Sequence, residues 1–407
     1  MEKPKNNFLK YCIQITAYTV ALMFLNGAIV QAFLLFVGLS EDAVYAYSSL
    51  SQLAQVIAMI LMIFLSGKIK NGRRLSAISN IIMLLPLSLM IIGAISPSLF
   101  TDAFIILLLV FCFVTFSGIG VYAVLTYCLP FDLIDIADYG KLTGVSGAAA
   151  GVSTFALASL HTLIISNFDY LVAMIWFFVL AAASAILSAV MFFSMKELPR
   201  GQNKNSAIGW SDIIEVFKNR DTYYLLVPNF ARGLAMGIFN VMAVMAVSSG
   251  IADTSEVSAL TIVTQAASFV ANIVFSIFYK KVSLENMLII STVGVCISLP
   301  FCMSFGFVAF LIFNLISLFF RFIIDSAIPT ALVNIIPESQ IGAYSSIRML
   351  IFTASQAVAA IIITPLVSLV GNIGVLIFAA VMQLVCGIGH YLVVILHKKQ
   401  TKAYFIS

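Results

Sequence analysis

Polar side chains interrupt several long apolar stretches of this sequence, where a hydrocarbon solvent would surround them. Arg232 is the most demanding, because a guanidinium is permanently charged and needs a carboxylate, backbone carbonyls or an anionic ligand. At 1.5 Å per residue, Arg232 is expected about 15 Å from the cytoplasmic end of its helix. No carboxylate is expected at that depth. Snorkelling to the membrane interface and a purely structural hydrogen bond are the alternatives to ligand binding.

Amide side chains are candidates for the same binding site. Gln52 and Gln265 hold matching places in two similar segments, SSLSQLA at 48–54 and TIVTQAA at 261–267. Amides offer donors and acceptors, so a facing pair can bind hydroxyl groups, whereas hydrogen bonding between neighbouring helices is the alternative. The residues predicted to bind a small polar solute are Asn26, Gln31, Gln52, Arg232, Asn240, Gln265 and Gln356.

Charged residues near the expected cytoplasmic ends of the apolar stretches form a second group. Arg321 and Asp325 are spaced i, i+4, which lets the two side chains pair on one helix face. Ion pairs that form in only one conformation can bias a conformational cycle, and ordinary solvated loop charges are the alternative. The predicted cytoplasmic gate comprises Arg73, Arg74, Asp132, Asp135, Asp138, Arg321, Asp325 and Arg348.

Patterns typical of catalysis or metal binding are not found in the sequence. His161, His390 and His397 are scattered, and the apolar stretches contain no Ser/His/Asp arrangement, phosphate loop or metal-ligand helix motif. His161 could carry a proton, with a satisfied core histidine as the alternative. The six cysteines lack metal-ligand spacing and are expected in the core. We therefore expect no enzymatic activity, no cofactor, no metal and no disulfide.

Transmembrane helices are the elements expected to position these residues. The chain is 62% hydrophobic and 9% charged, with a mean hydropathy of +1.11, whereas about 25% of residues are charged in a soluble domain. The fold class predicted is an all-α polytopic membrane protein with about twelve transmembrane helices in two six-helix pseudo-repeats. Stretches of about 20 apolar residues predict spans at 9–37, 43–66, 75–95, 103–127, 145–166, 170–194, 222–248, 257–279, 286–304, 307–327, 346–370 and 373–396.

An internal repeat divides the chain into two halves. LPFDLIDIADYGKLTGVS at 129–146 resembles IPTALVNIIPESQIGAYS at 328–345, about half a chain apart. Duplicated membrane halves predict a transporter, because a cavity between them can open to either side in turn. The predicted halves are 1–195 and 222–407, joined by a cytoplasmic linker at 196–221. Within the linker, apolar residues at i, i+3, i+4 and i+7 predict an amphipathic helix on the membrane surface: Trp210, Ile213, Ile214 and Phe217.

The distribution of charge predicts the orientation. All of the 21 Lys and Arg residues except Arg232, Arg321 and Arg348 fall in segments that are cytoplasmic if the N-terminus is cytoplasmic. This positive-inside bias predicts a multi-pass protein of the cytoplasmic membrane with both termini in the cytoplasm, and the long first apolar run predicts no cleavable signal. The net charge of +4 then belongs to loops that face anionic lipid. No separate basic domain suggests a nucleic-acid partner.

The chain as a whole resembles the major facilitator superfamily, with two six-helix halves, a cytoplasmic central loop and short connections elsewhere. The segment IDIADYGKLTG at 134–144 is similar to a loop of the glycoside–pentoside–hexuronide:cation symporters, the melibiose permease group, and matches it at Asp135, Asp138, Tyr139, Gly140 and Gly144. SGKIKNGRR at 66–74 resembles the superfamily's basic loop but lacks its acid. The melibiose permease group holds its coupling cation with carboxylates in the second and fourth spans. The corresponding spans of this chain, 43–66 and 103–127, contain no carboxylate in their interior. The resemblance implies the fold and sugar-like solutes.

The sequence therefore predicts a secondary transporter that moves a small polar organic solute, favouring a sugar or glycoside, by alternating access around a central site. Two alternatives stay open: an exporter of amphipathic or drug-like compounds, and a non-transporting membrane sensor or scaffold. The expected partners are the solute, the lipid bilayer and a coupling cation, proton or sodium. The solute, the direction of transport, the coupling ion and the oligomeric state are left open.

Overall fold

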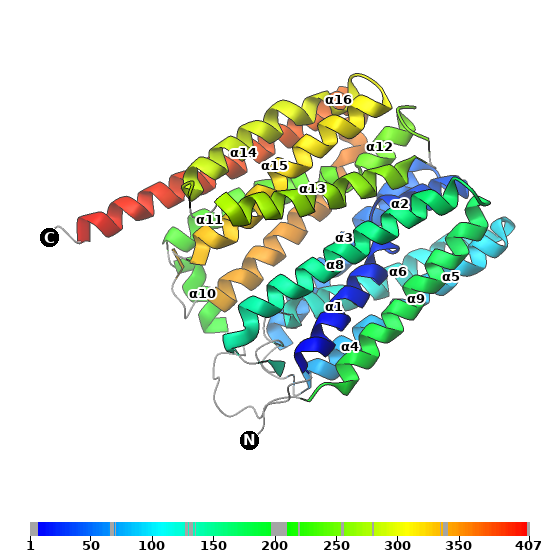
Figure 1. Ribbon diagram of the computed structural model, residues 1–407, viewed down its shortest axis with the longest axis horizontal. Helices are drawn as coiled ribbons and strands as arrows, with labels where there is room; N and C mark the ends of the chain where they lie inside the picture. Colours follow the sequence, from blue (N-terminus) through cyan, green and yellow to red (C-terminus); the bar gives the residue numbers. More distant parts are fainter. Residues whose placement is uncertain are drawn as a thin grey trace. The chain divides into compact units, whose positions relative to one another are not determined.

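The protein is described by a computed structural model that is helical throughout its regular elements (Figure 1). The structure describes residues 7–65, 69, 71–126, 129, 133–134, 136–196, 210–218, 220–253, 256–278, 281–333, 335–336 and 341–404. Within these ranges no strand is present, as expected where lipid offers the backbone no hydrogen-bond partner and each helix satisfies its own amides.

Helices long and apolar enough to cross a bilayer account for most of the described residues. Ten candidate spans meet that description within these residues, and a shorter apolar helix lies at Ala259–Phe275. The last candidate, Ala343–Leu396, is 54 residues long and contains Gly371 with φ 70°, so it consists of two helices. Counted in this way over the described part of the chain, the twelve predicted spans are confirmed as apolar helices.

Contacts divide the chain into two compact units, Met1–Ile208 with Asp253–Thr261, and Gly209–Ala252 with Ile262–Ser407. In the first unit, α1 packs on α8 and α9, α3 packs on α6, and α4 and α5 pack on α6 and α9. Its helices are α1 (Asn7–Met23), α2 (Ala28–Phe36), α3 (Glu41–Leu65), α4 (Gly72–Ile82), α5 (Leu84–Ile95), α6 (Asp102–Leu125), α8 (Ile136–Ile165) and α9 (Tyr170–Ser194), with the 3₁₀ turn η2 (Pro97–Leu99).

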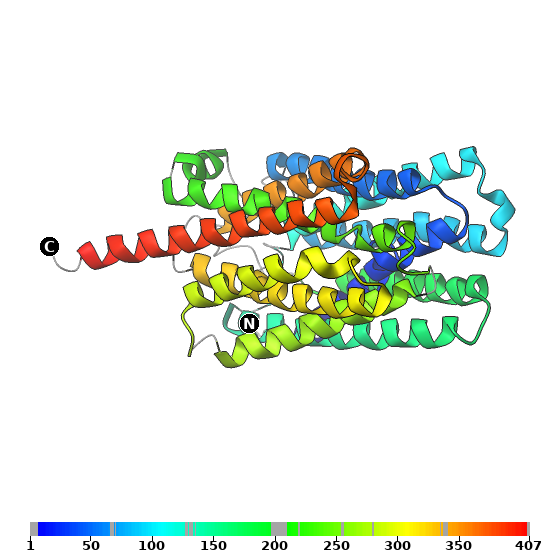
Figure 2. The same ribbon diagram turned by 90° about the horizontal axis from the view of Figure 1, so that it is seen from above.

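In the second unit, the most extensive packing joins α11 to α16, and α14 packs on α15 and α16. Its helices are α10 (Trp210–Lys218), α11 (Arg220–Phe239), α12 (Met242–Ser248), α14 (Leu284–Ser298), α15 (Phe307–Val333) and α16 (Ile341–Tyr404), with the 3₁₀ turn η3 (Leu299–Met303). The helix α13 (Val257–Phe278) belongs to this unit from residue 262 onward. The orange and red segments of α16 run in opposite directions in Figures 1 and 2, which makes α16 a helical hairpin that turns at Gly371.

In each unit the first span is divided into two helices, and the second of these helices ends in the same backbone motif. The predicted span 9–37 is divided into α1 and α2 at residues 24–27, and the corresponding stretch of the second unit is divided into α11 and α12 at residues 240–241. Beyond each break a glycine with positive φ ends the helix, Gly38 at 93° and Gly250 at 69°. At both glycines, paired backbone hydrogen bonds run back to the last turn, 38→35 with 39→34 and 250→247 with 251→246, as in a Schellman motif. The repeat therefore extends to backbone geometry.

Small residues allow α11 to approach α16 closely. A Cβ atom added to Gly233 would overlap the hydroxyl of Ser355, and one added to Gly237 would lie 2.5 Å from the Cβ of Ala359. Glycines four residues apart on one helix face are typical of close packing between membrane helices, where small side chains let backbones approach. This approach brings the side chains of α11 against those of α16.

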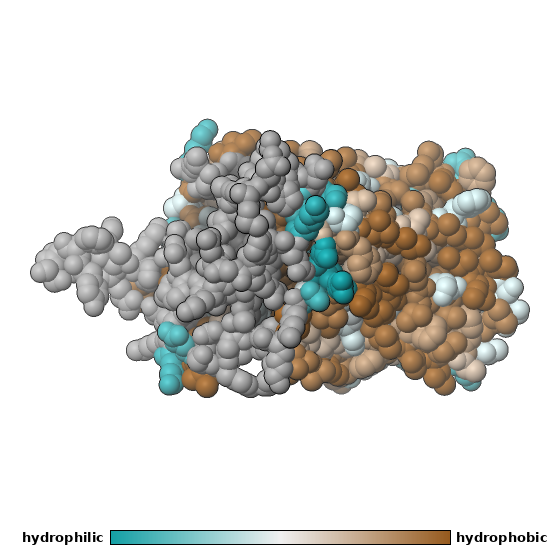
Figure 3. All heavy atoms as spheres, turned by 90° about the horizontal axis from the view of Figure 1, so that it is seen from below, coloured by the Kyte–Doolittle hydropathy of each residue, from teal (hydrophilic) through white to brown (hydrophobic). Residues whose placement is uncertain are grey.

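Apolar side chains cover the outside of the described helices. Leu369, Val308 and Trp176 are 79%, 70% and 69% exposed, and brown, hydrophobic residues dominate the described part of the face in Figure 3. In the linker, α10 buries Val216 and exposes Ile214 and Phe217. The predicted linker helix is present, and its contact with a membrane surface stays a prediction.

Candidate functional site

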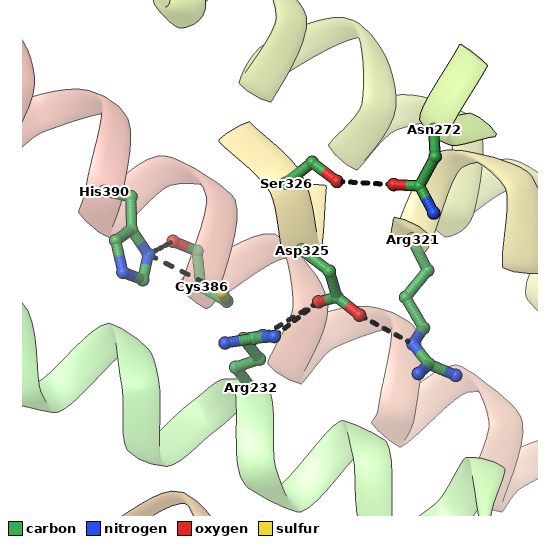
Figure 4. Close-up of polar contacts among 7 residues, drawn as sticks. All are labelled: Arg232, Asn272, Arg321, Asp325, Ser326, Cys386 and His390. Carbon is green, nitrogen blue, oxygen red and sulfur yellow. Dashed lines mark hydrogen bonds and ion pairs between the residues drawn. The ribbon is translucent and has the colours of Figure 1, made fainter. Parts of the chain in front are cut away.

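A carboxylate shared by two arginines lies inside the second unit (Figure 4). Arg232 of α11 donates two hydrogen bonds to one oxygen of Asp325, from Nε at 3.0 Å and from Nη2 at 2.6 Å. The other carboxylate oxygen is 3.4 Å from Nε of Arg321. The side chains of Arg232, Arg321 and Asp325 are 15%, 11% and 22% exposed. Two guanidinium groups and one carboxylate leave this arginine–aspartate cluster with one positive charge.

The local sequence explains how these groups meet. Arg321 and Asp325 lie one turn apart on α15, so their side chains leave the same face of the helix. Arg232 precedes Gly233, one of the two glycines at which α11 closely approaches α16. The close approach of the two helices places the guanidinium carbon of Arg232 4.8 Å from the ring centre of Phe352 on α16. Helix spacing set by a glycine therefore positions the charged group.

Aromatic rings also hold the second arginine. The guanidinium carbon of Arg321 lies 4.7 Å from the ring centre of Phe322 and 5.3 Å from that of Phe239, the last residue of α11. Both distances are within the range at which an aromatic ring attracts a cation. Contacts of this kind restrict the guanidinium without using its hydrogen-bond donors.

The cluster joins residues that the sequence analysis assigned to two different roles. The predicted i, i+4 pairing of Arg321 with Asp325 is present. The expectation that no carboxylate reaches the depth of Arg232 is wrong, because Asp325 contacts it directly. Depth estimated along each helix separately placed Asp325 near a helix end, and only the tertiary fold of the second unit brings the two residues together.

Two further residues predicted to bind solute contact each other in the second unit. Asn240, at the break between α11 and α12, donates from Nδ2 to Oε1 of Gln356 at 3.2 Å. Gln356 is 7% exposed on α16. Asn240 directly follows Phe239, whose ring centre lies 5.3 Å from the guanidinium carbon of Arg321. Gln265 lies partly buried on α13.

A buried histidine lies beyond the cluster in the same unit, and the sequence analysis gave it no role. Nδ1 of His390 lies 2.8 Å from the carbonyl oxygen of Cys386 and 3.6 Å from its sulfur, and His390 is 2% exposed. Nε2 of His390 has no hydrogen-bond partner within the described residues. The i, i+4 spacing of a cysteine and a histidine in an apolar run was the signal that could have drawn attention to this pair.

In the first unit, the predicted solute-binding amides lie on α2, on α3 and at the break that separates α1 from α2. Gln31 donates from Nε2 to the hydroxyl of Ser48 at 3.1 Å and is 2% exposed, and Gln52 on α3 is 7% exposed. The backbone N–H of Asn26 donates to the carbonyl of Leu22 at 2.8 Å. The structure thus places Asn26 and Asn240 at equivalent breaks of the two units.

A buried polar network in the first unit was missed by the sequence analysis. Ser188 of α9 accepts hydrogen bonds from Nε2 of Gln14 at 3.1 Å and from Nδ2 of Asn80 at 2.7 Å, and Gln14 also lies 3.2 Å from the hydroxyl of Tyr122. Gln14, Asn80 and Ser188 are fully buried. Gln14 of α1 and Asn80 of α4 both interrupt apolar runs of the sequence, and this was the signal that could have identified them. The network ties α1, α4, α6 and α9 together.

The structure describes only some of the remaining residues of the predicted gate. Arg73 is partly buried and Arg74 exposed on α4, while Asp138 falls within α8. Arg348 is partly buried on α16, and its carbonyl accepts a hydrogen bond from Asn229 at 2.7 Å. Asp132, Asp135 and the side chain of Asp138 lie outside the described residues. His161, 3% exposed, packs its ring 4.8 Å from that of Phe177.

Comparison with known proteins establishes the architecture. No family model and no curated protein match the sequence. Among solved structures, a D-xylose–proton symporter is similar with a TM-score of 0.68 at 15% identity over 96% of both chains. The E. coli fucose:proton symporter FucP is similar with 0.65 at 14% identity over 96% of this chain and 99% of that one. The nucleoside transporter NupG is similar with 0.62 at 12% identity, over 98% and 99%.

The chain has the major facilitator fold. Together with the apolar helices, this likeness makes the chain a multi-pass membrane protein. Within the major facilitator fold of this chain, the arginine–aspartate cluster is built by α11 and α15 with an aromatic ring from α16. Among the described residues, no three His, Cys, Asp or Glu side chains gather in a way that could hold a metal ion. The chemistry available at the cluster is the binding of anions and hydroxyl groups.

Proposed function

We propose that this chain is a secondary transporter, and not an enzyme, that moves a small polar organic solute by alternating access between residues 1–195 and 222–407. The observation that carries the proposal is the arginine–aspartate cluster of Arg232, Arg321 and Asp325 inside an apolar helical unit. Ionisable groups within membrane spans are costly, and they are kept where they serve a ligand or an ion. Sugars and glycosides are the solutes we favour.

The solved structures with a similar fold support this choice of solute class. They include a D-xylose–proton symporter, a fucose:proton symporter and a nucleoside transporter, all of which carry small polar solutes. The motif at 134–144, similar to that of the glycoside–pentoside–hexuronide:cation symporters, supports the same class. Membership of that narrower group is part of the proposal.

Polar side chains from both halves would bind the solute. The Asn240–Gln356 amide pair supports this assignment in the second unit, because amide side chains are groups that can donate to and accept from the hydroxyl groups of a solute. In the first unit, the buried Gln31 already contacts the hydroxyl of Ser48. The proposed solute contacts are Asn26, Gln31, Gln52, Arg232, Asn240, Gln265 and Gln356.

Charged residues at the cytoplasmic ends of the helices would form a gate that closes in one state of the cycle. Arg321 and Asp325, although assigned to that gate from the sequence, belong to the same cluster as Arg232. We therefore propose that this part of the gate responds directly to solute. The other proposed gate residues are Arg73, Arg74, Asp132, Asp135, Asp138 and Arg348.

A proton is the coupling cation that we favour over sodium. Two of the similar structures are described as proton symporters, and Asp325 supplies a titratable carboxylate within the cluster. Transport would take place at the cytoplasmic membrane, with both termini in the cytoplasm, as the positive-inside charge distribution supports.

Uptake into proteoliposomes tests the proposal. Purified protein would be reconstituted, and entry of labelled mono- and disaccharides, glycosides and sugar acids would be followed with an imposed proton gradient, a sodium gradient or neither. We expect saturable uptake of at least one of these solutes that increases with the proton gradient and is absent from protein-free vesicles. Uptake driven by sodium alone would reassign the coupling ion. No uptake of any of them, with broad binding of unrelated amphipathic compounds, would contradict the proposal and favour an exporter.

A pair of matched variants tests the binding residues. Asn240→Leu should raise the KM for the transported solute by about 2- to 10-fold, because it removes one neutral hydrogen bond worth about 0.5–1.5 kcal/mol. Asn167→Leu is the control, because Asn167 is exposed at the end of α8. An unchanged KM in the Asn240 variant would remove the amide pair from the site.

A further inference from the structure

We infer that a stripe of polar side chains on α13 lines a water-filled path along which the solute reaches the arginine–aspartate cluster. The α13 polar stripe consists of Thr264, Gln265, Ser268 and Asn272. This inference rests on the proposed transport function and names a surface that the solute contacts before it arrives at the same site. Its basis is the position of the stripe on the helix, its exposure and its hydrogen bonds.

The stripe occupies a side of α13 that differs from the lipid-facing side. Its members lie at i, i+1, i+4 and i+8, a spacing that keeps side chains on one face of a helix. The exposed apolar residues of α13 repeat this spacing five positions later, which places them roughly 140° away around the helix. These exposed apolar residues are Phe269, Val270, Ile273 and Ile277. The polar stripe therefore points away from the side that meets hydrocarbon.

The stripe is open and not packed away inside its unit. Thr264, Gln265 and Ser268 are partly exposed, and Asn272 is exposed. Polar side chains within membrane spans are costly in lipid, and those that are not buried in a bundle face a water-filled cavity. Hydroxyl and amide groups donate and accept hydrogen bonds and carry no charge, so this surface fits water and the hydroxyl groups of a polar solute.

The first unit carries a matching stripe that is closed. In the register of the two similar segments, residues 51, 52 and 55 of α3 correspond to residues 264, 265 and 268 of α13. Ser51 is fully buried, and Gln52 is 7% exposed. The helix α6 covers this part of α3, because a Cβ atom added to Gly120 would lie 2.5 Å from the carbonyl oxygen of Gln55. The same pattern thus packs between helices in one unit and stays open in the other.

Hydrogen bonds join the α13 polar stripe to the helix that carries the cluster. Oδ1 of Asn272 accepts from the hydroxyl of Ser326 at 3.0 Å, and Nδ2 of Asn272 donates to the hydroxyl of Ser268 at 3.4 Å. Ser326 directly follows Asp325 on α15, and Figure 4 shows the contact of Ser326 with Asn272 next to the cluster. The stripe extends about 12 Å along α13 at 1.5 Å per residue. A solute that moves along it arrives at the guanidinium groups.

Cysteine accessibility tests the inference without knowledge of the solute. Thr264→Cys, Ser268→Cys and Asn272→Cys would be made in the full-length protein, with Val270→Cys and Ile273→Cys as matched controls on the lipid-facing side. Each variant in vesicles would meet a charged, membrane-impermeant maleimide on both sides, and peptide mass spectrometry would report labelling at the introduced position. We expect labelling of the stripe cysteines to be at least about tenfold faster, because the reactive thiolate forms in water and is disfavoured in apolar surroundings.

Controls keep the accessibility test decisive. Labelling after denaturation should be equal for all the introduced cysteines, and the Tm of each variant would show that it is folded. If Asn272→Cys does not fold, Thr264→Cys and Ser268→Cys decide the outcome. Stripe cysteines that react as slowly as the lipid-facing controls would overturn the inference, and so would equal labelling of both sides.

A bulky side chain links the path to uptake. In Ser268→Trp the indole would fill the path, so uptake in the proteoliposome assay should fall to the level of protein-free vesicles. Ile273→Trp, on the lipid-facing side, should keep the wild-type rate. Reactive stripe cysteines in a protein that takes up no solute would leave the path standing and contradict the transport function. Uptake with unreactive stripe cysteines, or wild-type uptake by Ser268→Trp, would leave the transport function standing and overturn the inference.

Discussion

Arg232 of α11 donates two hydrogen bonds to a single oxygen of Asp325 of α15, 93 residues further along the chain. Because the second oxygen faces Arg321, each oxygen of this carboxylate contacts a guanidinium group. The stability of the second unit should therefore depend on Asp325 more than on either arginine.

Replacing Asp325 with asparagine should lower stability by about 3 kcal/mol, because two guanidinium groups would then lose the carboxylate that they share in an apolar unit. The Tm of the purified variant in detergent would measure this loss. The control is Asp253→Asn, since Asp253 is exposed and lies outside the helices. Equal losses in the two variants would mean that the ion pairs contribute nothing.

Removing Arg321 as well should recover part of that loss. In the double variant Asp325→Asn with Arg321→Gln, one guanidinium remains, as in the wild-type charge balance, and repulsion between two cations is absent. A double-mutant cycle on Tm-derived free energies should give a coupling of about 0.5–3 kcal/mol, the range seen for residues in direct contact. Additive effects would indicate that Arg321 does not sense the charge of Asp325.

A single methyl group should disturb the contact that positions Arg232. In Gly233→Ala the new Cβ would overlap the Ser355 hydroxyl and lie 2.5 Å from the carbonyl oxygen of Phe352. We expect a loss of about 1–3 kcal/mol, typical of overpacking, measured by thermal unfolding. Gly151→Ala is the matched control, because an added Cβ there meets nothing within 4 Å. Equal stability of the two variants would show that α11 and α16 can separate at no cost.

The polar network of the first unit should depend on Ser188. Ser188→Ala removes the acceptor shared by Gln14 and Asn80, which leaves two buried amide groups with fewer partners. The expected loss is about 1–3 kcal/mol in unfolding free energy. Ser159→Ala on α8 is the control, because Ser159 is partly exposed and bonds only within its own helix. Unchanged stability of Ser188→Ala would mean that other acceptors replace the hydroxyl.

Hydropathy predicted the helices well because a bilayer leaves the chain little choice. A span needs about 20 apolar residues, and its backbone must satisfy its own hydrogen bonds, so composition alone locates it. The boundary of α9 agrees with the predicted range 170–194. Breaks inside spans were not predicted, because the few polar or flexible residues at the breaks, Asn26 with Gly27 and Asn240, leave the mean hydropathy of each span high.

The candidate site was predicted only as a set of residue types. Buried polarity drew attention to Arg232, Asn240 and Gln356, and helical spacing alone predicted the pairing of Arg321 with Asp325. The same reasoning passed over Gln14, Asn80 and the His390–Cys386 contact.

The sequence by itself determined where the long apolar helices lie and which polar residues interrupt them. Only the tertiary structure decided which polar groups meet: Asp325 with Arg232, and Asn240 with Gln356, pairs separated by 93 and 116 residues. The physical reason is the distance along the chain over which each effect acts. Hydropathy and helical periodicity act over a few turns of one helix, whereas the partner of a buried charge is chosen by how closely two helices can pack.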